Sequence, residues 1–221
     1  MKVLLIDTCG ETGSLALAET GGPRGVVVAS LTLPARKASE RLVASIRELA
    51  TGAQIPLDQL GAVVVVHGPG SFTGVRVGVS TAKGLCEALG IPAIAISRLA
   101  VLAQSAPSGS RVAAFLDAGR GEFYCGVYQD SDPLRESLLT RTHALAAAEG
   151  SSVVVCEPAV AAALADLHPA LVAEPTAEAA LPIAILRIAA GQFDEVATLD
   201  ANYLRRTDAE IFAKPQARAS V

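Results

Sequence analysis

Short continuous apolar runs alternate along this chain with longer stretches of helical periodicity, a pattern typical of an α/β protein. Residues 3–7 form an apolar run that ends in Asp7, as a buried strand would. Residues 14–19 and 26–33 are predicted to be two further strands. The Gly-Gly-Pro sequence at 21–23 lies between them, where a hairpin turn is expected. The chain therefore begins with three predicted strands.

The hydrophobic period then lengthens to about 3.6 residues, which predicts helices. We expect one helix at about residues 39–51 and a second at 71–89. Each is followed by a short apolar run that predicts a buried strand, at 62–66 and at 93–96.

The same order of patterns restarts after a polar stretch at residues 105–110. Residues 112–116 are apolar and precede Asp117, as residues 3–6 precede Asp7. We interpret the chain as a duplicated βββαβα unit, with an N-terminal lobe at 1–100 and a C-terminal lobe at 101–221. The last helix of the second lobe could pack back on the first. The alternative is two similar strands in one larger sheet.

Composition favours a globular protein that does not bind nucleic acid by itself. Apolar residues make up 51% of the chain and charged residues 18%, and the formal net charge is −4 without a cluster of Lys and Arg. The four cysteines are scattered and form no C-x-x-C pair, which fits a reducing compartment. No run of 18 uncharged apolar residues occurs, so we expect a cytoplasmic protein without a membrane span.

A glycine-rich turn at residues 68–74, reading GPGSFTG, joins a predicted strand to the second predicted helix. Backbone N–H groups at a helix N-terminus attract anions, but this turn lacks the Gly-Lys-Ser/Thr ending of a P-loop. A tight structural turn and a phosphate site both remain open. The candidate nucleotide- or anion-binding residues are Asp7, Thr8, Gly68, Gly70, Ser71 and Gly74.

The helix after this turn has two faces without charge. One face carries apolar residues that can pack on a sheet, and the nearly opposite face carries Val77, Thr81, Gly84 and Ala88. Glycine inside a helix costs about 1 kcal/mol against alanine, which close approach of another helix can offset. The covering helix could come from a partner chain or from residues 40–50 of this chain.

We expect no catalytic residue, no metal site and no cofactor. The three histidines are far apart, and neither H-x-x-x-H nor H-E-x-x-H occurs, so no helix-borne pair of histidines can bind a metal. Asp7 and Asp117 each end the first strand of a predicted lobe. Either could hold a metal-bound water, or could accept hydrogen bonds from backbone N–H groups of its own turn.

Residues 68–99, reading GPGSFTGVRVGVSTAKGLCEALGIPAIAISRL, strongly resemble the TsaB family, also called YeaZ. The stretches LLIDT at 4–8, DAGRGEFY at 117–124 and NYLRRTDA at 202–209 agree with it in order and spacing. One departure is visible: Ala38 stands where many relatives have a histidine just before Ser-Glu. A role for that histidine is therefore not expected here.

The resemblance implies an actin-like or sugar-kinase-like (ASKHA) fold and a non-catalytic subunit of the complex that makes threonylcarbamoyladenosine in tRNA. The implied partners are a catalytic TsaD-like paralogue, a TsaE-like ATPase, a second copy of the chain when it is alone, and tRNA only through the complex. Family members pair through two N-terminal helices, so the implied interface is Leu42, Ile46, Leu49, Val77, Thr81, Gly84 and Ala88. The alternatives are an ATP-dependent phosphotransferase and a glycoprotease-like metallopeptidase of the same fold.

Overall fold

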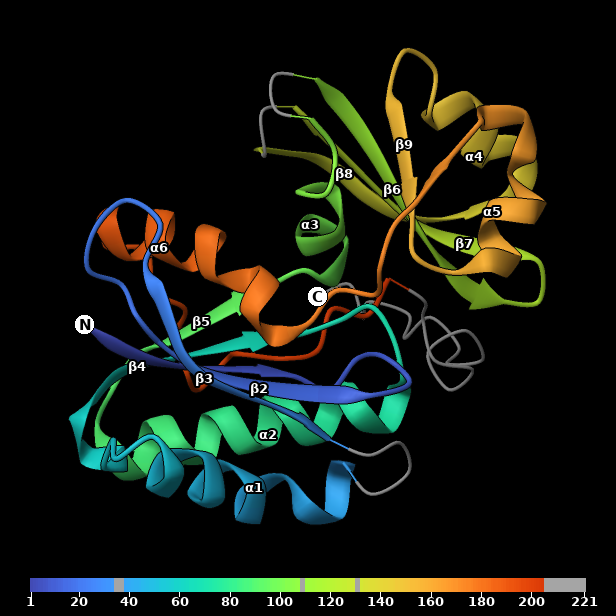
Figure 1. Ribbon diagram of the computed structural model, residues 1–221. Coiled ribbons are helices and arrows are strands. Elements are labelled where there is room, and N and C mark those ends of the chain that lie inside the picture. Colours follow the sequence, from blue (N-terminus) through green and yellow to red (C-terminus); the bar gives the residue numbers. More distant parts are fainter. Residues whose placement is uncertain (34–37, 108–109, 130–131, 205–221) are drawn as a thin grey trace, which may run out of the picture.

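Two separate five-stranded sheets organise the chain into two lobes (Figure 1). The computed structural model describes residues 1–33, 38–107, 110–129 and 132–204. The strand order is β3-β2-β1-β4-β5 in the first sheet and β10-β9-β6-β7-β8 in the second, which is the same order when read from the other edge. The predicted α/β fold with a duplicated βββαβα unit is confirmed, and the alternative of one larger sheet is wrong.

The first sheet combines an antiparallel meander with parallel strands. β1 pairs with β2 antiparallel and with β4 in parallel, and its central residues are fully buried because both faces of the sheet are covered. The strands are β1 (Lys2–Asp7), β2 (Gly13–Glu19), β3 (Val26–Leu33), β4 (Leu60–Val66) and β5 (Ala93–Ile96).

Helices cover both faces of this sheet (Figure 1). α1 (Ala38–Gly52) and α2 (Phe72–Leu89) lie side by side on one face, with the short 3₁₀ helix η1 (Leu57–Gln59) between them in sequence. The 3₁₀ helix η3 (Ala177–Ala180) and α6 (Leu181–Ala189) come from the far end of the chain and pack on the other face. The core of the first lobe therefore contains residues from both halves of the sequence.

The second sheet is covered in the same two-sided way. Alternate residues of β6 point to opposite faces, so Ala113 and Phe115 pack with α4 and α5, while Ala114 and Leu116 pack with α3. The elements are α3 (Arg98–Ala103), β6 (Arg111–Gly119), β7 (Glu122–Gln129), β8 (Asp132–Thr140), α4 (Arg141–Ala147), β9 (Ser152–Val155), α5 (Pro158–Ala163), η2 (Ala165–Leu167) and β10 (Ala170–Leu171).

Between β1 and α6, the described backbone passes from one lobe to the other at two places. The first crossing leads from β5 into α3, and the second leads from β10 to η3. After α6 the backbone runs back along the first lobe, where Asp194 N donates to Ala93 O (2.9 Å) and Lys83 Nζ donates to the carbonyls of Ala197 and Leu199 (both 3.0 Å). The lobe boundary expected at residue 100 stays a prediction.

Three of the expected interface residues need correction. Leu42, Ile46 and Leu49 lie in the core of the first lobe, because they form the face of α1 that packs on its own sheet. The outward face of α1 carries Val43 instead, which is 53% exposed. No helix in the described parts of the chain is long and apolar enough to cross a membrane.

Candidate functional site: the cleft between the lobes

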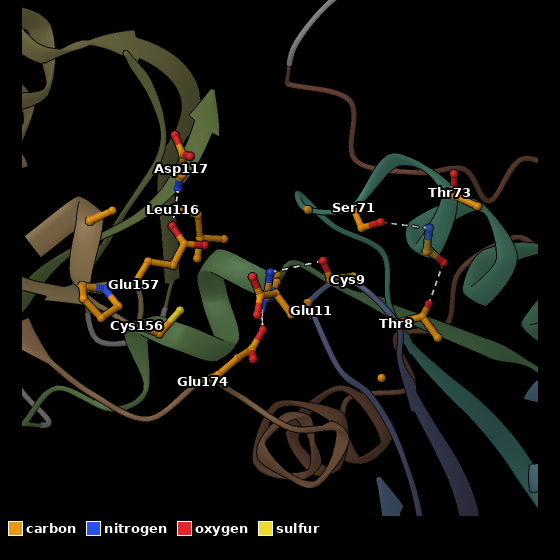
Figure 2. A pocket seen from close by; sticks show the side chains of 17 residues that line it. Thr8, Cys9, Glu11, Ser71, Thr73, Leu116, Asp117, Cys156, Glu157 and Glu174 are labelled. Atoms are coloured by element: carbon orange, nitrogen blue, oxygen red, sulfur yellow. Dashed lines mark hydrogen bonds and ion pairs between the residues drawn. The ribbon is translucent and has the colours of Figure 1, made fainter. Parts of the chain in front are cut away.

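A cavity of about 840 Å³ lies between the two lobes, and we call it the interlobe cleft. Both lobes and both crossings contribute to its walls, as Figure 2 shows from close by. Its polar lining consists of Thr8, Glu11, Ser71 and Thr73 from the first lobe, Asp117, Cys156 and Glu157 from the second, and Arg98 and Glu174 from the crossings.

The β1–β2 turn forms the floor of the cleft on the first-lobe side. Asp7 ends β1, and its Oδ1 accepts a hydrogen bond from Cys9 N (2.8 Å), which fixes the turn. The Cys9 thiol donates to Val66 O (3.1 Å) at the end of the neighbouring strand. Asp7 is only 2% exposed, and this burial raises the pKa of its carboxyl group, although the nearby Arg98 opposes the shift.

The glycine-rich turn and the start of α2 pack directly against this floor. Ser71 caps α2 by accepting from Gly74 N (3.3 Å), Ser71 N donates to Cys9 O (2.8 Å), and Thr8 Oγ1 donates to Gly74 O (2.7 Å). A Cβ at Gly74 would overlap the Thr8 carbonyl oxygen, and one at Gly70 would overlap the Cys9 carbonyl oxygen. These glycines are required for close packing of the turn, whatever else it does.

Arg98, at the start of α3, donates hydrogen bonds to both the β1–β2 turn and the glycine-rich turn. It is 4% exposed, and its NH1 donates to Cys9 O (3.3 Å) while its backbone N donates to Gly68 O (2.7 Å). Its NH2 pairs with Glu174 Oε1 at 2.5 Å. Burial alone would lower the pKa of Arg98, but the neighbouring Asp7 and other acidic groups raise it, so the guanidinium stays charged.

On the second-lobe side the cleft is lined by carboxylates. Asp117 ends the buried part of β6, and its Oδ1 accepts from Gly119 N (2.8 Å). Glu157 Oε2 accepts from Asp117 N (2.7 Å), and burial raises the pKa of Glu157. The lining contains four carboxylates, on Glu11, Asp117, Glu157 and Glu174, against the single guanidinium of Arg98. With Glu174 in place, this charge balance disfavours a polyphosphate ligand.

The two thiols of the cleft are poor nucleophiles near neutral pH. Burial and the adjacent Asp7 raise the pKa of Cys9 well above its usual range, and burial raises the pKa of Cys156 to about 11. Since the thiolate is the reactive form, neither cysteine is prepared for attack. Within the described part of the chain, no group of three or more His, Cys, Asp or Glu residues could hold a metal ion.

The structure separates the residues predicted to bind an anion into two groups. Thr8, Gly70, Ser71 and Gly74 line the cleft, whereas Asp7 and Gly68 lie behind its wall, with Asp7 buried. The hydroxyls of Thr8 and Ser71 are engaged inside the turn. The assignment of these residues to an anion stays a prediction.

Sequence reasoning missed Arg98, Glu157 and Glu174. Arg98 carries the clearest signal, because it is a single charge at the start of α3, in an otherwise apolar stretch that begins at residue 93. Glu174 lies in a loop and carries no periodic signal.

A second candidate surface lies on the outer side of α2. Of the four residues predicted to meet a partner, Gly84 and Ala88 are exposed, while Val77 and Thr81 are half-buried. A Cβ at Gly84 would have no neighbour within 4 Å. At the N-terminal end of the same helix, the Arg76 guanidinium stacks over Phe72, 3.6 Å from the ring centroid, and Arg76 Nε donates to Tyr203 OH (2.5 Å).

Comparison with known proteins identifies the family. The sequence model of TsaD, described as tRNA N6-adenosine threonylcarbamoyltransferase, matches residues 27–151. The TsaB proteins of Escherichia coli and Bacillus subtilis are 36% and 34% identical over 132 and 140 residues. The chain belongs to the TsaD family, in its TsaB (YeaZ) branch. These two alignments cover 58% and 63% of this chain and only 55% and 60% of the TsaB proteins.

Longer matches extend the similarity over most of the chain. An uncharacterized protein of Mycobacterium tuberculosis is 34% identical over 184 residues, which cover 83% of this chain and 82% of that protein. The solved structure of YeaZ from Pseudomonas aeruginosa superposes with a TM-score of 0.75 at 29% identity, over 92% of this chain and 99% of the other. The activator of the 2-hydroxyisocaproyl-CoA dehydratase from Clostridium difficile shares the fold, with a TM-score of 0.52 at 11% identity over 87% of this chain and 97% of that one.

Proposed function

We propose that this TsaB-family chain is a non-catalytic subunit in threonylcarbamoyladenosine biosynthesis on tRNA, where it scaffolds and activates a TsaD-like transferase. The names of the relatives from Escherichia coli and Bacillus subtilis support the pathway. The match to the TsaD family model supports kinship with the transferase as the basis of the pairing. The TsaE-like ATPase and the tRNA then meet this chain only within the complex.

The observation that carries the scaffolding role is the outer face of the α1–α2 pair. Gly84 and Ala88 of α2 and Val43 of α1 are exposed, and the space over Gly84 is open. Small residues on a helix allow the backbone of a second helix to approach closely, and burial of Val43 would add a favourable hydrophobic term. The face therefore suits a pair of helices from the TsaD-like paralogue, or from a second copy of this chain when the paralogue is absent.

A phosphotransferase of the same fold is the second candidate, because the interlobe cleft is large enough for a nucleotide. The excess of carboxylates in the cleft argues against it. The proposal predicts no metal-dependent ATP hydrolysis by the purified chain. ATP turnover that is lost in Asp7→Ala would favour the phosphotransferase instead.

The scaffolding role is tested by Gly84→Arg. The long charged side chain would block helix approach and would be costly to bury, so pairing with the TsaD-like paralogue should be lost while the fold is kept. Gly21→Arg is the matched control, because Gly21 is also exposed with no neighbour within 4 Å of a Cβ but lies away from α1 and α2.

The measurements are sedimentation of the mixed subunits and reconstituted tRNA modification. We expect both to fail with Gly84→Arg and to be normal with Gly21→Arg. Normal pairing of the folded Gly84→Arg variant would reject this face as the interface.

A further inference from the structure

The carboxylate of Glu174 lies directly on the β1–β2 turn. A Cβ built on Gly10 would collide with Glu174 Oε1 and with the Arg98 guanidinium. The turn therefore already has an anion against its backbone, and that anion is paired with Arg98 at 2.5 Å. Figure 2 shows Glu174 next to the segment that carries Cys9 and Glu11.

The two members of this ion pair belong to the two crossings between the lobes. Arg98 begins α3 on the first crossing, and Glu174 lies between β10 and η3 on the second. The side chain of Arg98 is 5% exposed, whereas that of Glu174 is 37% exposed and lines the cleft. The cation is thus fixed in the wall of the cleft, and the carboxylate reaches it from the open side.

We propose that Glu174 is a built-in occupant of an oxyanion site at Arg98, beside the β1–β2 turn, and that it keeps free phosphate compounds out of the interlobe cleft. The guanidinium fork of arginine binds carboxylates and phosphates with the same geometry. Within the described part of the chain, Arg98 Nε is buried without an acceptor, so the cation has a further donor to offer. A free polyphosphate must displace the Glu174 carboxylate from Arg98. Because that carboxylate belongs to the same chain, it returns to Arg98 without the translational entropy that a free ligand loses on binding.

The inference is independent of the partner face on α1 and α2. Arg98 can bind a polyphosphate in the cleft, but the Glu174 carboxylate occupies its position. Removal of that side chain should therefore create a binding site in which the bound anion contacts Arg98.

The test is titration of the whole chain with tripolyphosphate, and separately with ADP, at low salt and without metal. Glu174→Ala should bind tripolyphosphate on the order of tenfold more tightly than the unaltered chain, because it frees a buried guanidinium. Glu11→Gln is the matched control: it removes one negative charge from the same cleft but leaves the Arg98–Glu174 pair in place. An equal gain in Glu11→Gln, or no gain in Glu174→Ala, would overturn the proposal.

The position of the bound anion is tested without altering Arg98, whose replacement risks the fold. In nitrogen-15 spectra of Glu174→Ala, the Arg98 Nε–H resonance should shift as tripolyphosphate is added, and it should stay unchanged in the unaltered chain. That resonance is assigned by through-bond correlation to the side-chain and backbone carbons of Arg98. Binding that leaves the Arg98 signal unmoved would place the ligand elsewhere and reject the site.

Discussion

The ends of the first strand in each lobe share one local hydrogen bond and differ in their surroundings. In the β1–β2 turn, Asp7 accepts from the backbone N of Cys9, two residues later, and in the β6–β7 turn Asp117 accepts from Gly119 N, both at 2.8 Å. Asp7 is buried beneath Arg98, whereas Asp117 is exposed beside Glu157. The duplicated unit therefore preserves the turn and not its charge environment.

An aspartate at the end of a strand is therefore not by itself a sign of chemistry. A hydrogen bond from residue i+2 needs only the turn, so each lobe can keep the aspartate for local reasons. The first turn is also tied to the crossings between the lobes, through Arg98, Cys9 O and Glu174. Variants of the two turns should therefore have unequal effects.

The largest effect is expected from Arg98→Ala. The substitution removes the buried guanidinium that donates to Cys9 O and whose charge offsets that of the buried Asp7, and an uncompensated buried charge costs about 3–5 kcal/mol. Urea unfolding at neutral pH measures the loss. A loss below about 1 kcal/mol would mean that the first turn does not depend on its network.

The next effect is expected from Gly74→Ala. The new Cβ would overlap the Thr8 carbonyl oxygen, which is backbone and cannot rotate away, so we expect a loss of about 1–3 kcal/mol. Gly84→Ala, in the same helix and in open space, should instead raise the free energy of unfolding by up to about 1 kcal/mol. Equal effects of the two alanines would contradict the close packing of α2 on the first turn.

A smaller effect, visible in its pH dependence, is expected from Asp7→Asn. Burial raises the pKa of Asp7 above its usual 3.8, so the contribution of this group to stability is fully present below that value and is lost as pH rises through the folded-state pKa. The unaltered chain should therefore lose stability relative to Asp7→Asn as pH rises from about 4 toward neutrality. The urea concentration at the unfolding midpoint, measured for both proteins at several pH values, gives the difference. If the two midpoints change with pH in parallel, burial does not perturb the pKa of Asp7.

The smallest effect is expected from Asp117→Asn. The asparagine Oδ1 can still accept from Gly119 N, and the exposed site requires no charge, so the free energy of unfolding should change by less than about 0.5 kcal/mol. Thermal unfolding at neutral pH is sufficient to check it. A loss as large as that of Arg98→Ala would show that the second turn also has a buried network.

Much of the fold could be predicted from the sequence, because strands and helices bury side chains at different periods. The apolar runs of β1, β4 and β6 and the periodicity of α2 carry that information directly. The assignment of Leu42, Ile46 and Leu49 to a partner failed for a physical reason. A single apolar face on a helix is used first by the chain's own sheet, and periodicity does not say which chain covers it.

The network of the candidate site could not be predicted in the same way. The Arg98–Glu174 pair joins residues 76 positions apart, and it depends on where two crossings meet after both lobes have formed. The sequence shows the glycines of residues 70–74 but not that Thr8 and Cys9 pack against them, because a close approach between backbones leaves no periodic pattern.

The covering of the first sheet by η3 and α6 has a consequence for biosynthesis. Ala177, Ala180, Leu181 and Ala184 are part of the first lobe's core, so a ribosome must translate the whole second lobe before the first can close. Until then the face of the first sheet that η3 and α6 cover stays exposed, so the first half of the chain cannot complete its core ahead of the second half.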